Sequence, residues 1–153
     1  MKRLLIRGIV VVVAGAVISR PELTSAQLLL AAKPAAHVAI IQGPMLELAV
    51  DNFAILRWTS TNPGRDDDHF AIAHYGTAPG DLSQTAKSHI RLNPNHPETI
   101  FRVRLSGLKP RTTYYYWVTS MAGDGRNDGV KSGINQFTTP APGQRIINYP
   151  QPK

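Results

Sequence analysis

Four consecutive aromatic residues after a proline-containing turn constrain the fold of this chain more than any other feature of its sequence. They lie in GLKPRTTYYYWV, residues 107–118. Aromatic residues are enriched in β-strands, and successive side chains of a strand point to opposite faces. A strand over 112–121 therefore has two faces: Tyr114, Tyr116 and Val118 lie on one, and Tyr115, Trp117 and Thr119 lie on the other.

Six further segments with β-strand character occur at short and regular spacing. Turn signals such as Gly43-Pro44 separate them, and the 153 residues include 12 Gly and 12 Pro, which favours many turns. No stretch beyond the N-terminal segment keeps a 3.6-residue apolar period long enough for a helix. The pattern predicts one all-β domain, a seven-stranded immunoglobulin-like antiparallel β-sandwich. The expected strands cover 37–42, 53–60, 69–75, 84–92, 98–105, 112–121 and 130–138.

Two of these segments alternate clearly enough for their faces to be assigned. A half-buried strand shows one apolar face and one polar or charged face. Trp58 is the largest side chain on the apolar faces and is the expected centre of the core. The expected inward residues are Ala54, Leu56 and Trp58 in the second segment, and Phe101, Val103 and Leu105 in the fifth.

The turn before the aromatic run has the residues of a tyrosine corner. In this motif a tyrosine hydroxyl bonds back to the backbone a few residues upstream. We expect Tyr114 to make this bond, Leu108 to bury the loop and Pro110 to fix its direction. Tyr116 points to the same side of the strand as Tyr114. These residues are therefore predicted to be structural.

Four motifs of this chain occur together in a known family. They are the Trp58 strand, Tyr75-Gly76-Thr77, the run from Leu108 to Val118, and the segment from Ser132 through Phe137 to Thr139. Together they resemble a fibronectin type III domain, and they are most similar to the variant at the N-terminus of purple acid phosphatases. In that variant a YGT strand end and a GLKPxTxYYYxV run recur. The resemblance covers about residues 37–139, and it departs from the family at Arg111, where a glycine usually follows the proline.

The first 26 residues have the pattern of a secretory signal peptide. Lys2, Arg3 and Arg7 precede an apolar run of eleven residues at 8–18, and small residues follow at 24–26. The run is short for a membrane span, although an uncleaved N-terminal anchor is the alternative. We expect cleavage after Ala26, or alternatively after Ala32. The protein is then secreted, periplasmic or held at the cell surface. The expected divisions are 1–26 signal peptide, 27–36 linker, 37–139 sandwich domain and 140–153 proline-rich flexible tail.

The charge and the absence of cysteine exclude several classes of function. The whole chain carries +7, and the expected leader contains four of its 17 basic and one of its ten acidic residues, so the remainder carries +4. Such a modest surplus gives no indication of nucleic-acid binding. The chain has no cysteine, which excludes disulfides, a thiolate nucleophile and an iron–sulfur site.

No catalytic or metal-binding constellation can be recognised, so we expect no enzyme activity, no metal and no cofactor. The resemblance implies that a phosphatase would carry its two metals on a separate α/β domain, which these 153 residues do not include. Asn95-His96-Pro97-Glu98 lies in a proline-rich turn without flanking ligands. The acidic segment 66–69 and the loop 123–129 are interpreted as solvated turns rather than calcium sites.

Two surfaces are candidates for binding. Tyr115 and Trp117 lie on the outer face of their strand, where they could stack on sugar rings or pack against another domain. Arg57, Arg102 and Arg104 are expected to cluster on the outer face of the other sheet, because the second and fifth strands of such a sandwich are neighbours. Three guanidiniums could bind sulfate, phosphate or acidic polysaccharide. The alternative for the aromatics is ordinary strand-face packing, in which they lie under the tail or an adjacent loop. The alternative for the arginines is solvation alone.

These observations predict an exported, non-catalytic binding module with an unknown protein or glycan partner. We expect no nucleic-acid partner and no membrane span in the mature chain. Two alternatives remain open at this point. The resemblance implies an accessory domain that works with a separately encoded metallophosphatase or other hydrolase, and the third possibility is a structural spacer.

Overall fold

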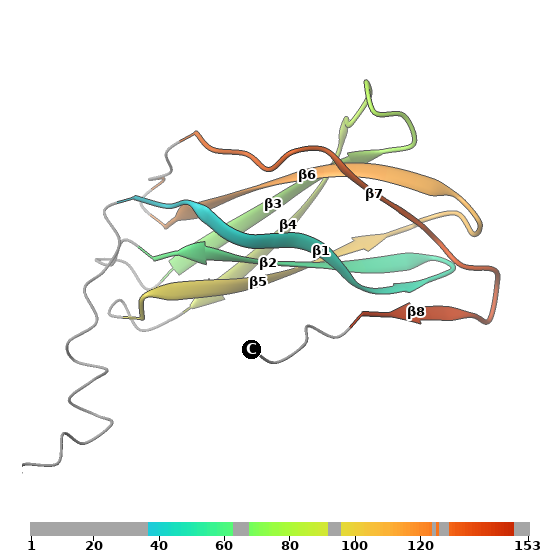
Figure 1. The fold of residues 1–153 in the computed structure, drawn as a ribbon, viewed down its shortest axis with the longest axis horizontal. Helices are drawn as coiled ribbons and strands as arrows, with labels where there is room; N and C mark the ends of the chain where they lie inside the picture. The colour runs from blue at the N-terminus through green and yellow to red at the C-terminus, as the bar shows by residue number, and fades with distance from the viewer. Residues whose placement is uncertain (1–36, 63–67, 92–95, 124, 126–128, 149–153) are drawn as a thin grey trace, which may run out of the picture.

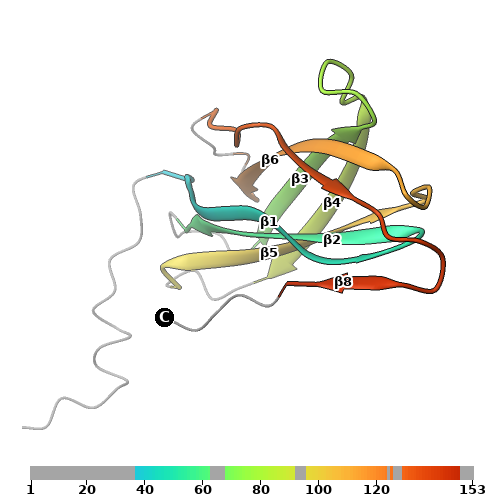
Figure 2. The same cartoon turned by 45° about the vertical axis from the view of Figure 1, so that its right-hand side comes forward.

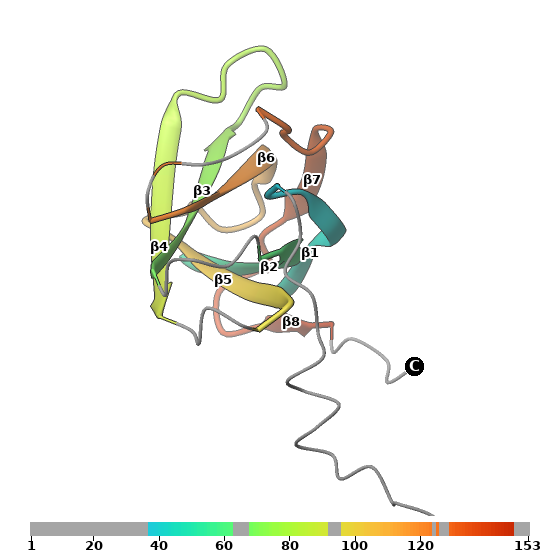
Figure 3. The same ribbon diagram turned by 90° about the vertical axis from the view of Figure 1, so that its left-hand side faces the viewer.

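The chain folds into two antiparallel β-sheets that pack face to face (Figures 1 and 3). The computed structural model describes residues 37–62, 68–91, 96–123, 125 and 129–148. One sheet has the strand order β5-β2-β1-β8 and the other has the order β4-β3-β6-β7. The strands are β1 (Ile40–Val50), β2 (Phe53–Thr61), β3 (Asp68–Gly76), β4 (Gln84–Arg91), β5 (Glu98–Ser106), β6 (Thr113–Ala122), β7 (Asn135–Thr138) and β8 (Arg145–Ile147).

The core lies between the sheets and contains the side chains that the alternation pattern predicts. Trp58 is fully buried and its ring centroid lies 5.6 Å from that of Phe101. Its indole Nε1 donates a hydrogen bond of 2.7 Å to Ser120 Oγ on the opposite sheet. Alternate residues of β5 and β6 are buried along nearly their whole length, as period-two patterning requires.

The first strand is longer than the sequence indicates. The turn signal at Gly43-Pro44 predicted an end at Gln42, but β1 continues to Val50 beside β2. Three register shifts interrupt this pairing, and Gly43 has φ of 79°, which a glycine adopts without strain. The prediction was wrong because a bulged strand accommodates a glycine and a proline that would end a regular one.

The last part of the fold also differs from the prediction. The seventh strand begins at Asn135 rather than at Val130, although Ser132 still bonds β6 through Val118. An eighth strand lies at 145–147, inside the segment expected to be a proline-rich flexible tail. Figure 2 shows the chain leaving β7 and reaching the opposite sheet, where β8 runs beside β1. Three residues are too few for a recognisable sequence alternation, so this strand was not predicted.

Two of the expected divisions of the chain fall wholly on residues outside those that the structure describes. They are the signal peptide at 1–26 and the linker at 27–36. Within the described ranges, no helix has the length and apolar character needed to cross a membrane.

Candidate binding surfaces

The turn before β6 has the geometry of a tyrosine corner. The hydroxyl of Tyr114 accepts a hydrogen bond of 2.9 Å from the backbone N–H of Lys109, and Leu108 is buried beneath the loop. Arg111 has φ of 49°, in the left-handed region that favours glycine. The glycine that the resemblance leads us to expect after Pro110 would adopt this conformation without strain, and arginine adopts it here.

The remaining tyrosine of the inner face is held by the core. Tyr116 is almost completely buried, and burial raises the pKa of its hydroxyl to about 12 because the charged form is poorly solvated there. Tyr114 and Tyr116 both lie near Phe137, with ring centroids 5.8 Å and 5.9 Å from it. These rings are therefore parts of the core, not of a binding surface.

The three predicted arginines lie on the outer face of the sheet β5-β2-β1-β8, but each has a different environment. Arg57 pairs directly with Arg102 in the register of β2 and β5, whereas Arg104 lies opposite Ile55. The Arg102 guanidinium forms an ion pair of 2.7 Å with Glu47, which raises the pKa of Arg102. The strand register therefore places the three arginines on one face of the sheet, but they do not form a single exposed cluster of guanidinium groups.

The other two guanidiniums differ in exposure. The guanidinium of Arg104 lies 3.5 Å from the ring centroid of Phe53 and donates to Ser106 Oγ. Arg57 is buried, and its Nε and Nη1 have no hydrogen-bond partner among the described residues. A sulfate or phosphate group would reach Arg104 more readily than Arg57.

On the other sheet, the outer side of β6 carries Trp117, whose ring is contacted by two other side chains. The ring centroids of Trp117 and His74 are 3.9 Å apart and their planes are nearly parallel, at 7°. Lys131 Nζ lies 5.1 Å from the Trp117 centroid. Burial, and to a lesser degree the charge of Lys131, lowers the pKa of His74. The indole thus contacts two side chains of its own chain.

This stack is part of a continuous half-buried surface, which we call the aromatic face. Strand register aligns outward residues of β3 with those of β6 in successive rows. Phe70 also stacks on His89 of β4, with centroids 4.9 Å apart. The aromatic face consists of Phe70, Ile72 and His74 on β3 and Tyr115, Trp117, Thr119 and Met121 on β6.

Sequence reasoning identified Tyr115 and Trp117 but missed the residues that β3 contributes. The segment HFAIAHY has large side chains at 70, 72 and 74 and alanines between them. The alanines Ala71 and Ala73 are fully buried, whereas the larger residues face outward. An assignment by size alone would place the large residues of this segment inside the sandwich, and it would therefore choose the wrong face.

Charged residues surround the aromatic face on two sides. Lys87 on β4 lies beside Ile72 in the register, and Lys131 contacts Trp117. Asp68 at the end of β3 accepts from His89 Nε2 at 2.8 Å. The two lysines therefore give this surface a basic margin.

The segments considered for metals provide no converging ligands in the part of the chain that the structure describes. No group of three or more His, Asp or Glu side chains able to hold a metal occurs among those residues. The Nδ1 atom of His96 bonds the backbone carbonyl of Glu98 at 2.7 Å, and His69 is buried in the interior. Asp66, Asp67 and most of the loop at 123–129 lie outside the described residues.

The two-layer antiparallel sandwich and its tyrosine corner define a fibronectin type III-like domain. Residues 45–139 match the purple acid phosphatase N-terminal domain, and the chain belongs to this family. A search of curated proteins finds no match.

Two similar solved structures have low sequence identity to this chain. The sensor domain of the anti-sigma factor RsgI4 from Pseudobacteroides cellulosolvens is 20% identical, with a TM-score of 0.46, covering 74% of this chain and 97% of that chain. The fn3 domain of human contactin 1 is 14% identical, with a TM-score of 0.39, covering 69% and 90%.

Proposed function

We propose that this domain is a non-catalytic interaction module that binds another exported protein through its aromatic face. The observation that carries the proposal is the contiguous half-buried surface on β3 and β6, flanked by Lys87 and Lys131. Aromatic and methionine side chains are enriched in the centre of protein interfaces. The two lysines favour a partner with acidic groups around an apolar centre.

The ring contacts favour a protein partner over a sugar. A sugar stacks on an open aromatic ring face, but here the Trp117 ring is contacted by His74 and by Lys131. These two residues come from opposite neighbours of β6, namely β3 and the segment before β7. These contacts leave less of the Trp117 ring open to a stacked sugar.

The test is a binding measurement with a matched pair of variants. Ile72→Asp places a charge in the aromatic face, whereas Ile100→Asp places it on the outer face of the opposite sheet, where Ile100 is 43% exposed. A partner is first captured from exported proteins of the source cell and then purified. Ile72→Asp is expected to weaken its Kd at least tenfold, and Ile100→Asp less than twofold. Equal effects of both variants would refute the assignment of the face.

A glycan array tests the carbohydrate version of the same proposal. Binding that is lost in Trp117→Ala would identify a sugar ligand and contradict the protein assignment. Binding that is lost in Arg102→Ala instead would assign an acidic glycan to the other sheet. No binding by the wild-type domain removes the glycan version.

The family match favours a second candidate, in which the partner is a separately encoded metallophosphatase. The domain would then position or stabilise the enzyme without supplying metal ligands. The test measures phosphatase turnover of such an enzyme with and without this domain. Turnover by the domain alone with iron, zinc or manganese, abolished by a chelator, would overturn the non-catalytic proposal.

Export is proposed from the leader pattern at 1–26. Mass spectrometry of the mature N-terminus is expected to show cleavage after Ala26. An intact Met1 on the exported protein would instead support the uncleaved anchor.

A further inference from the structure

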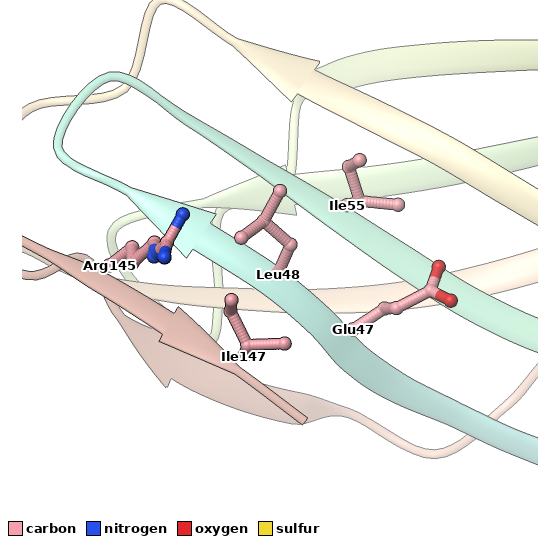
Figure 4. A pocket seen from close by; sticks show the side chains of 5 residues that line it. All are labelled: Glu47, Leu48, Ile55, Arg145 and Ile147. Carbon is pink, nitrogen blue, oxygen red and sulfur yellow. The ribbon is translucent and has the colours of Figure 1, made fainter. Parts of the chain in front are cut away.

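A pocket of about 260 Å³ lies on the sheet opposite to the aromatic face, where β8 joins β1. Its floor is formed by three aliphatic side chains, and one charged side chain lies at each end (Figure 4). The lining residues are Glu47, Leu48, Ile55, Arg145 and Ile147.

A bulge in β1 creates one wall of this pocket. Leu46 pairs with Leu56 and Leu48 pairs with the adjacent Ile55, so Glu47 is the extra residue in β1. A bulge redirects side chains, and here it leaves the consecutive residues Glu47 and Leu48 lining the same pocket. This wall of the pocket is therefore a direct result of the bulge in β1.

Strand β8 supplies the opposite wall and is fixed to the bulge. Leu48 pairs with Ile147 in the register. The backbone N–H of Asn148 donates to the Glu47 carbonyl at 2.9 Å, and its side-chain Nδ2 donates to the Leu46 carbonyl at 3.2 Å. Asn148 thereby satisfies two backbone acceptors of the bulge, which holds Arg145 and Ile147 in position.

The two charged ends of the pocket are not equivalent. Both carboxylate oxygens of Glu47 accept hydrogen bonds from Arg102, at distances of 2.7 to 3.1 Å. Arg145 makes no ion pair or hydrogen bond with any side chain in the described ranges, and it is exposed. The positive charge of Arg145 is therefore available to a ligand, whereas the negative charge of Glu47 is already neutralised.

We propose that this pocket binds a carboxylate attached to a branched aliphatic group about the size of one leucine residue. The aliphatic group contacts Leu48, Ile55 and Ile147, and the carboxylate pairs with Arg145. A guanidinium matches a carboxylate with two parallel hydrogen bonds, which gives the site its selectivity for an acid. The volume is below the range of about 300 to 1,000 Å³ typical for drug-sized ligands, which restricts the ligand to a small group. Such a group occurs in a free short-chain acid and at the C-terminus of a polypeptide.

The test is an NMR titration of the isotope-labelled domain with N-acetyl-leucine and with N-acetyl-leucinamide. The acid is expected to shift the amide signals of residues 47, 48, 145 and 147. The amide lacks the negative charge and is expected to bind at least about tenfold more weakly. Equal affinity for acid and amide would overturn the role of Arg145, and no shift at these residues would overturn the site.

Three variants separate the site from non-specific binding. Arg145→Gln removes the free charge from an exposed position and is expected to weaken binding of N-acetyl-leucine about tenfold. Ile147→Trp is expected to fill the pocket and abolish binding. Lys109→Gln removes an equal charge from an exposed turn outside the pocket lining, and it is expected to change affinity less than twofold. Equal losses in Lys109→Gln and Arg145→Gln would reduce the effect to general surface charge and refute the site.

A peptide that ends in leucine identifies the source of the ligand. If the free-acid peptide binds more tightly than N-acetyl-leucine and its amidated form does not bind, the ligand is a polypeptide C-terminus. If the peptide binds more weakly, the site takes a free acid. Either result supports the pocket, because both require the carboxylate.

Discussion

The two outer faces of the sandwich use the same period-two alternation for different purposes. On β4-β3-β6-β7 the outward side chains stack on one another, as Trp117 does on His74. On β5-β2-β1-β8 the outward side chains include several charged ones, and Arg102 crosses β2 to reach Glu47. The first face stays apolar and half-buried, whereas the second balances part of its charge internally. Alternation thus specifies which side chains face outward, whereas the residues of the neighbouring strands determine which contacts these side chains make.

The largest expected effect tests whether the two sheets form one cooperative unit. Trp58→Ala removes the largest fully buried side chain, which contacts Phe101 and bonds Ser120 of the other sheet. We expect a loss of about 3–5 kcal/mol in the free energy of unfolding, measured by urea denaturation. Fluorescence of Trp117 and far-UV circular dichroism should lose signal together. Two separate transitions would show that the sheets are stable independently.

Adjacent tyrosines of β6 distinguish the inside of the sandwich from its aromatic face. Tyr114→Phe removes the hydroxyl that accepts from Lys109 N and leaves a partly buried N–H without its partner. The expected cost is about 1–2 kcal/mol in the same denaturation experiment. The matched control is Tyr115→Phe on the outer face, with an expected change below about 0.5 kcal/mol. Similar losses for both would contradict the structural role of Tyr114.

The same comparison shows how much of the fold the sequence predicts. The core faces of β2 and β5 follow from alternation, because Trp58 and Phe101 leave little choice of direction. The tyrosine corner follows from the spacing of Leu108, Pro110 and Tyr114. Strand β8 and the full length of β1 do not follow, since a bulge and a three-residue edge strand depend on pairing between distant segments.

The candidate sites were predicted less completely than the fold. Tyr115 and Trp117 were found because their strand was certain, whereas His74 was missed because its face was not. The predicted arginine cluster is only adjacent in register, because Glu47 and Phe53 engage two of its members. Arg145 was missed because its segment showed no strand pattern. The contacts of a long side chain depend on which distant segments lie beside it in the fold, and the alternation of residues along one strand does not contain that information.

A smaller effect compares single substitutions on the two outer faces. Trp117→Ala removes the stack with His74 and the contact with Lys131, and we expect a loss of about 1–2 kcal/mol in unfolding free energy. Glu47→Gln weakens an ion pair whose arginine is 56% exposed, so solvent screening limits the expected loss to about 0.2–1 kcal/mol. A larger loss for Glu47→Gln would reverse the contrast between the faces.

The smallest expected effect is a change in the titration of His74. The pKa of His74 in the folded protein lies below the usual 6.5, so in the range between these two values the unfolded chain binds more protons than the folded one. The free energy of unfolding therefore decreases as the pH falls from 6.5 towards the pKa of the folded state. Lys131→Gln removes the smaller of the two causes and should raise the pKa of His74, measured by NMR of the ring protons. Arg104→Gln removes an equal charge from the opposite face and should leave this pKa unchanged. A shift in both variants would indicate a long-range effect of net charge.

The hydroxyl of Ser120 has a consequence for how the sheets are aligned. It accepts from the Trp58 indole and also lies 2.6 Å from Ser60 Oγ, so three polar groups from both layers meet in an otherwise apolar interior. If one layer slid over the other, these groups would lose their partners away from water, at a cost of about 1–3 kcal/mol each. Apolar packing alone allows several relative positions of the two sheets with similar energy. The hydrogen bonds among Trp58, Ser60 and Ser120 can form in only one of these positions, so they determine how the two sheets are aligned.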